Sequence, residues 1–255
     1  MNKVTSIGWS QASWNPVTGC QNPCQFDYCY NTQKATAPLN RFGSCYYSAH
    51  KKAFVTTKNW LGRQTKNRRL YVAKQGERYP RGFDPTWYES RLWYPKKVKV
   101  PQRVFVVDTG DLFGKWIPAE WIEKVIEVMT ACDWHKYFLL TKNPKRYQEF
   151  TFPDHCWLGA TVTGQKDAGK IRIMQGLNHP HKFLSVEPLF TPLAAPLDNL
   201  QWIVIGAQTG PNPRVPKAAW VDTIVQEARR VKAQIYLKEN LLPYYQGRTI
   251  YQQKP

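Results

Sequence analysis

Residues 103–111 read RVFVVDTGD, and they are the clearest indication of the fold class. Its first five residues form a near-continuous apolar run, which is typical of a parallel strand that is buried on both faces. Pro118 follows at a position where a helix can begin, because proline suits the first helical turn. Apolar side chains then recur with the i, i+3, i+4, i+7 spacing of an amphipathic helix, at Ile122, Val125, Ile126 and Met129. The stretch therefore predicts a strand followed by a helical crossover.

The same unit recurs along the rest of the chain. Further strands are predicted at residues 4–10, 135–141, 156–163, 182–188, 201–206 and 233–238, and helices at 145–150, 165–175 and 216–232. Strands that alternate with helical crossovers predict an α/β fold with a parallel sheet. Because the count reaches about seven or eight strands, we expect a full or partial TIM-like β/α barrel. An open doubly wound sheet is the alternative, although neither GxGxxG nor GxxxxGK[ST] occurs.

Basic residues are concentrated in one part of the chain. We expect a single domain, residues 1–255, with a basic and aromatic-rich insertion at about 32–82. The net charge is +18, and this insertion holds twelve Lys/Arg against one acidic residue, Glu77. Such a field attracts polyanions, so DNA or RNA is the expected partner, with a solvated surface as the alternative. The predicted nucleic-acid contacts are Lys51, Lys52, Lys58, Arg63, Lys66, Arg68 and Arg69.

Membrane insertion and secretion are not expected from the sequence. It has no run of eighteen apolar residues that could span a bilayer. Its first residues, MNKVTSIGWSQ, lack the apolar centre of a signal peptide. The predicted location is therefore the cytoplasm, where thiols stay reduced and the six cysteines are not expected to form disulfides.

Polar residues follow each predicted strand directly. The carboxyl ends of parallel strands carry the chemistry in β/α folds. Because these ends share one edge of the sheet, we expect their polar groups to line a common pocket. Asp111 and Glu187 are the candidate ligand groups, since an acidic residue just past a buried strand is costly unless it has a partner. The strand-end groups are Asp108, Thr109, Asp111, Thr141, Lys142, Asn143, Thr161, Thr163, Glu187, Gln208, Thr209 and Lys238.

Three cysteines, Cys20, Cys24 and Cys29, lie within ten residues of one another in the loop after the first predicted strand. A cluster of thiolates favours zinc or an iron–sulfur cluster. Three ligands leave one position for water, substrate or cofactor. The alternative is a closed zinc site in which Cys45 or His50 is the fourth ligand. In that case the chain would be a zinc-stabilised nucleic-acid-binding protein without catalysis.

Several segments resemble a phage and bacterial family of radical-SAM-like proteins, related in pattern to spore photoproduct lyase. The resemblance runs in the same order over nearly the whole chain. Its segments include WNPVTGC (14–20), FVVDTGDLF (105–113), LTKNPKR (140–146), FLSVEPL (183–189) and WIVIG (202–206). The spacing of the cysteines is C-x3-C-x4-C here, where radical S-adenosylmethionine enzymes usually have C-x3-C-x2-C. The resemblance implies a β/α barrel of the radical SAM type.

The resemblance also implies an activity and a set of roles. Cys20, Cys24 and Cys29 would hold a [4Fe-4S] cluster that binds S-adenosyl-L-methionine, and an electron donor such as flavodoxin or ferredoxin would reduce it. The resulting 5′-deoxyadenosyl radical would act on a nucleic acid or a nucleotide-like substrate. Cys45 would be a candidate hydrogen donor to a substrate radical. The groups implied to hold the cofactor are Tyr28, Asp108, Thr109, Asp111, Thr161 and Glu187.

Overall fold

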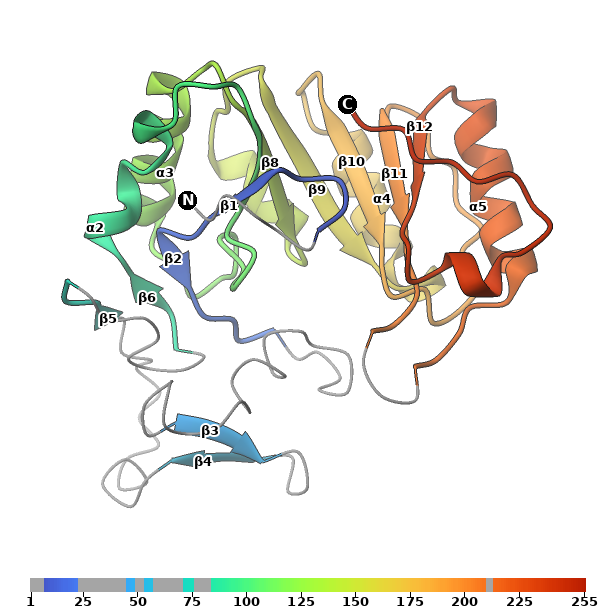
Figure 1. The fold of residues 1–255 in the computed structure, drawn as a ribbon, viewed down its shortest axis with the longest axis horizontal. Coiled ribbons are helices and arrows are strands. Elements are labelled where there is room, and N and C mark those ends of the chain that lie inside the picture. Colours follow the sequence, from blue (N-terminus) through green and yellow to red (C-terminus); the bar gives the residue numbers. More distant parts are fainter. Residues whose placement is uncertain (1–6, 23–44, 49–52, 57–70, 76–83, 210–212) are drawn as a thin grey trace.

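A computed structural model of the protein describes residues 7–22, 45–48, 53–56, 71–75, 84–209 and 213–255. Its main feature is a seven-stranded sheet in which every pair of neighbouring strands is parallel. The strand order follows the chain (Figure 1). The strands are β1 (Ala12–Trp14), β7 (Arg103–Val106), β8 (Lys136–Thr141), β9 (Cys156–Val162), β10 (Lys182–Val186), β11 (Trp202–Ile205) and β12 (Gln234–Leu237).

Helices cover one face of this sheet (Figure 1). The larger ones are α3 (Ala119–Ala131), α4 (Ala168–Gln175) and α5 (Ala218–Arg230), with 3-10 turns at η3 (Pro144–Glu149), η4 (Gln165–Asp167) and η5 (Leu242–Tyr244). Each of the three larger helices turns a buried apolar side toward the sheet, for example through Ile122 of α3 and Ile224 of α5. The large core therefore lies between the helices and the sheet. None of the described helices is long and apolar enough to cross a membrane.

Small elements fill part of the chain between β1 and β7. β2 (Val17–Thr18), β6 (Thr86–Trp87) and β5 (Tyr71–Val72) form a three-stranded sheet, and β3 (Cys45–Ser48) pairs with β4 (Ala53–Thr56). The helical turns α2 (Glu89–Leu92) and η2 (Pro95–Lys97) then lead into β7. Most of the predicted basic insertion, residues 32–82, lies outside the described residues. Its predicted nucleic-acid contacts, from Lys51 to Arg69, lie there too.

Aromatic side chains cover the other face of the sheet. Trp9 is 3% exposed and its ring lies 5.0 Å from that of Phe105 on β7 and 5.4 Å from that of Trp202 on β11. On a flat sheet, strands four places apart are separated by about 19 Å. A single indole can contact both strands only because the sheet curves around it. Phe138, Trp157, Phe183 and Tyr236 complete this aromatic cluster.

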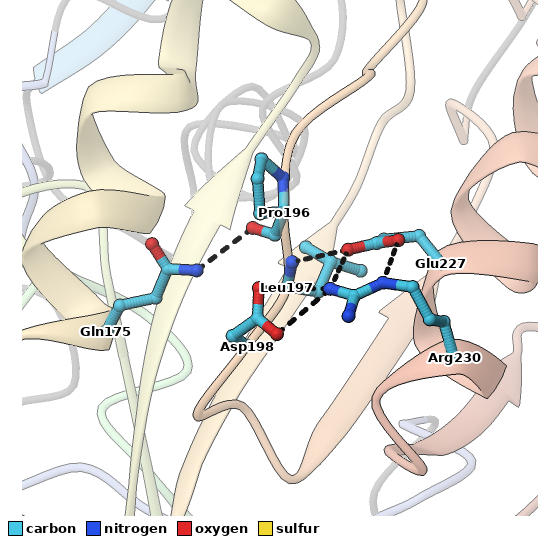
Figure 2. Close-up of polar contacts among 6 residues, drawn as sticks. All are labelled: Gln175, Pro196, Leu197, Asp198, Glu227 and Arg230. Atoms are coloured by element: carbon cyan, nitrogen blue, oxygen red, sulfur yellow. Dashed lines mark hydrogen bonds and ion pairs between the residues drawn. The ribbon is translucent and has the colours of Figure 1, made fainter.

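A charged network fastens the loop after β10 to the helix layer (Figure 2). Arg230 of α5 pairs with Asp198 at 2.9 Å and with Glu227 at 2.7 Å. The amide of Gln175, at the end of α4, donates to the carbonyl of Pro196 at 3.0 Å. Since the side chains of Arg230 and Asp198 are half exposed, solvent screens this ion pair and it contributes little to stability. The effect of the network is to hold this loop between α4 and α5.

The prediction of parallel strands alternating with helices is confirmed. Of the strand predicted at 4–10, residues 7–10 form a turn and a loop instead, residues 4–6 lie outside the described residues, and β1 begins at Ala12. Trp9 is used instead to fill the concave face, because one large ring there contacts several strands at once. The predicted short helix at 145–150 is the 3-10 turn η3. In the part of the chain that the structure describes, no pairing between β1 and β12 closes the sheet.

Protonation of one buried and two partly buried histidines is expected to weaken the fold in mild acid. Burial lowers the pKa of His135, His179 and His181 below the usual 6.5. Near and below pH 6.5 the unfolded chain therefore binds more protons than the folded chain does. The free energy of unfolding consequently decreases as the pH is lowered. Urea midpoints should drop between about pH 7.5 and 5.5, and less so for His135→Gln. The same drop in the variant would contradict this assignment, and midpoints between about pH 7.5 and 8.5 serve as the control.

Candidate functional site

A cavity of about 320 Å³ opens at the carboxyl ends of the strands. This volume falls within the range of roughly 300–1,000 Å³ that is usual for small-molecule sites. Every strand from β7 to β12 sends at least one polar residue from its carboxyl end into the lining, and the cysteine loop adds Cys20. The predicted common pocket of strand ends therefore exists. Its polar lining includes Cys20, Asp108, Asp111, Thr141, Lys142, Thr161, Glu187, Gln208 and Lys238.

A glycine pair places Cys20 at this cavity. Gly19 has φ 95, a conformation that glycine adopts without strain, and it pairs with Gly110 through an isolated parallel bridge. The Gly19 amide donates to the carbonyl of Thr109 at 3.1 Å, and the Asp111 amide donates to the carbonyl of Gly19 at 3.4 Å. A Cβ at Gly110 would lie 2.7 Å from the Gly19 oxygen. The close approach of the two backbones thus needs glycine at 110.

Asn22 joins the cysteine loop to the sheet, and sequence reasoning missed it. Its amide nitrogen donates to the Sγ of Cys20 at 3.4 Å and to Oδ2 of Asp111 at 2.7 Å. The two hydrogens of one amide group can serve both acceptors. The sequence shows only that a polar residue follows the candidate ligand Cys20 by two positions. This does not predict the contact with Asp111, which is far away in the sequence.

The carboxylate of Asp111 is 3% exposed and accepts four hydrogen bonds. Oδ1 accepts from Thr141 Oγ1 at 2.7 Å and from the amide of Phe113 at 3.1 Å. Oδ2 accepts from Asn22 and from the amide of Lys142 at 3.1 Å. Because a carboxylate has about four acceptor positions, these donors saturate it. Asp111 therefore holds the cysteine loop and the ends of β7 and β8 together, which is a positioning role.

Asn15 orders the start of the same loop. Its side-chain oxygen accepts from both the amide and the hydroxyl of Thr109, at 3.2 and 2.9 Å, and its amide donates to Asp108 at 2.5 Å. Val107, just before Asp108, has φ 59 and is buried. A β-branched residue in this conformation is strained, at a cost of about 1–3 kcal/mol. The strained turn directs Asp108 into the cavity lining.

The opposite wall carries an ion pair. Lys238, after β12, contacts Glu187, after β10, at 2.5 Å, and their side chains are 19% and 22% exposed. Thr161 and Ser185 lie beside them, both almost fully buried. Two opposite charges at the edge of one cavity suit a ligand that itself carries both charges. Glu187 and Thr161 therefore lie where sequence analysis expected them.

The remaining cysteines and Tyr28 are only partly covered by the described residues. Cys24, Cys29 and Tyr28 lie outside the described residues, and Cys45 belongs to β3, away from the main sheet in sequence and pairing. Among the described residues, no group of three or more His, Cys, Asp or Glu side chains could hold a metal ion. Cys132 and Cys156 are fully buried, and burial raises the pKa of both thiols. Cys20, in contrast, is partly exposed and lines the cavity.

The sequence of this chain matches a family model over residues 4–241, with the description "Protein of unknown function (DUF5131)". The chain belongs to the DUF5131 family. The matched range includes the three-cysteine loop, all seven strands of the main sheet and every residue named in the cavity. No curated protein and no solved structure matches the chain significantly. Membership of DUF5131 thus covers the whole site without assigning it a chemistry.

Proposed function

We propose that the protein is a radical S-adenosylmethionine enzyme that acts on a nucleic acid or a nucleotide-like substrate. The observation that carries the proposal is the position of Cys20. It belongs to a three-cysteine loop and lies at the carboxyl edge of a curved parallel sheet, beside a cavity lined by strand-end polar groups. Ligands bind at this edge in parallel β/α folds. The curvature around Trp9 further supports a partial barrel of the radical SAM type.

The donor set fits an iron–sulfur cluster. Cys20, Cys24 and Cys29 supply three thiolates from one loop, which matches the preference of such clusters for cysteine. Asn22 donates a hydrogen bond to the Cys20 sulfur, and hydrogen bonds to cluster sulfurs tune the reduction potential. The cluster with S-adenosylmethionine would supply a carbon-centred radical for hydrogen abstraction, with an electron donor of the flavodoxin or ferredoxin class.

The cavity offers groups for a zwitterionic cofactor. Glu187 and Asp108 provide carboxylate oxygens for an amino group, and Lys238 provides a cation for a carboxylate. When such a ligand binds, its amino group can replace Lys238 as the partner of Glu187, and its carboxylate can replace Glu187 as the partner of Lys238. Neither side chain is then left as an unpaired charge, which avoids a large desolvation penalty. Thr161 and Ser185 add hydroxyl groups to the wall. Phe105 and Leu140 also line the cavity, so part of its lining is apolar.

The test is the metal content of protein purified without oxygen. We expect iron and sulfide in the wild-type protein, their loss in Cys20→Ser, and their retention in Cys156→Ala. Cys156 is a matched control because it is buried in the helix-side core, away from the cavity. With S-adenosylmethionine and dithionite, the iron-containing protein should release 5′-deoxyadenosine. A colourless protein with one zinc, unchanged in the absence of oxygen, would overturn the proposal and favour a closed zinc site.

A further inference from the structure

A basic surface segment lies at the opposite edge of the sheet from the cavity. Residues 91–103 contain five Lys/Arg and no Asp or Glu. The segment leads into the amino end of β7, whereas the cavity opens at the carboxyl ends. Lys96, Lys97 and Lys99 are exposed, and none of the three forms an ion pair within the described part of the chain. Their charges are therefore available to a partner.

Two ring nitrogens hold the backbone beneath these lysines. Trp134 Nε1 donates to the carbonyl of Val98 at 2.8 Å. His135, which is 1% exposed, places Nε2 3.2 Å from the carbonyl of Pro95, so this nitrogen carries the hydrogen. Both donors precede β8, a central strand of the sheet. A solvated lysine-rich loop does not need such anchors, and here they fix the segment to the core.

Aromatic rings also order the lysine side chains. The Nζ atoms of Lys96, Lys97 and Lys99 lie over the rings of Trp93, Tyr94 and Trp134, at 5.5, 5.0 and 5.1 Å. Such contacts attract the ammonium groups to the ring faces and restrict the lysine side chains. Because the side chains are already restricted, less conformational entropy is lost when they bind a ligand. Trp93 itself is 39% exposed, which leaves part of its ring to a partner.

We propose that this basic strip, defined as Trp93, Lys96, Lys97 and Lys99, binds the phosphate backbone of a nucleic acid. Ordered cations beside an exposed ring match a strand whose phosphates pair with lysines and whose unpaired bases stack on an indole. A membrane surface fits less well, because Val100 is the one other large apolar side chain exposed nearby among the described residues. The expected partner, a nucleic acid, is the same as in the proposed function. Binding to the strip, however, does not require the cluster or S-adenosylmethionine.

The test uses a labelled single-stranded oligodeoxynucleotide of mixed sequence and its duplex. Affinities are measured by fluorescence anisotropy between roughly 50 and 200 mM salt. For Lys96→Gln/Lys97→Gln/Lys99→Gln we expect a loss of affinity of about tenfold or more at low salt, and a salt slope reduced by about 3. Trp93→Ala should weaken binding of the single strand more than binding of the duplex.

A matched variant removes the same charge elsewhere. Lys166→Gln/Arg172→Gln/Arg229→Gln alters three exposed residues of the helix layer and should change the affinity by no more than about twofold. Equal losses in the two triple variants would overturn the strip as a site, as would binding to phosphatidylserine vesicles but not to oligonucleotides. The metal content of the wild-type protein reports on the proposed function, whereas oligonucleotide binding by the lysine variants reports on the strip, so the two proposals fail independently.

Discussion

Asp111→Ala is expected to lower the free energy of unfolding by roughly 3 to 5 kcal/mol. The variant leaves four donors without their acceptor: the side chains of Asn22 and Thr141 and the amides of Phe113 and Lys142. At a site that is 3% exposed, water does not readily replace the lost carboxylate. The measurement is urea denaturation followed by circular dichroism.

The same variant should free the cysteine loop. Asn22 is the side chain that links Cys20 to Asp111, so alkylation of Cys20, followed by mass spectrometry, should become faster in Asp111→Ala. Asp154→Ala is the matched control, because Asp154 is exposed, and its effect should stay within about 0.5 kcal/mol. Unchanged stability together with an unchanged rate of alkylation would show that Asp111 does not hold this loop.

Trp9→Ala is expected to cost about 3 to 5 kcal/mol of stability, the usual range for removing a buried aromatic side chain. The indole contacts rings on β7, β8, β10 and β11, so its loss leaves a void that no single neighbour can fill. The expected result is a lower urea midpoint. Near-ultraviolet circular dichroism should also weaken, since the remaining rings lose their fixed packing.

Two further variants separate packing from aromatic content. Trp9→Phe keeps a ring and should recover at least half of the loss. Trp93→Ala removes a partly exposed indole and should cost less than about 1 kcal/mol. If Trp9→Ala were no more destabilising than Trp93→Ala, Trp9 would not be the side chain that fills the concave face of the sheet.

The class of fold follows from the sequence alone. Strands β7 to β12 each follow from an apolar run, because a strand buried on both faces has no polar positions to spare. Helices α3 and α5 follow from their amphipathic spacing. The sequence also determines which residues meet at the carboxyl edge, since parallel strands bring all their ends to one side. These features depend on the local spacing of apolar residues, which can be read directly from the sequence.

How the site is held depends on tertiary contacts. The contacts of Asn22 with Asp111, of Gly19 with Gly110, and of Trp9 with four strands all join residues far apart in sequence. The curvature of the sheet and the anchored basic strip depend on such contacts as well. Periodicity says which face of an element is buried, but not which distant partner covers it. That choice depends on shape and hydrogen bonding between elements, and it exists only once they pack.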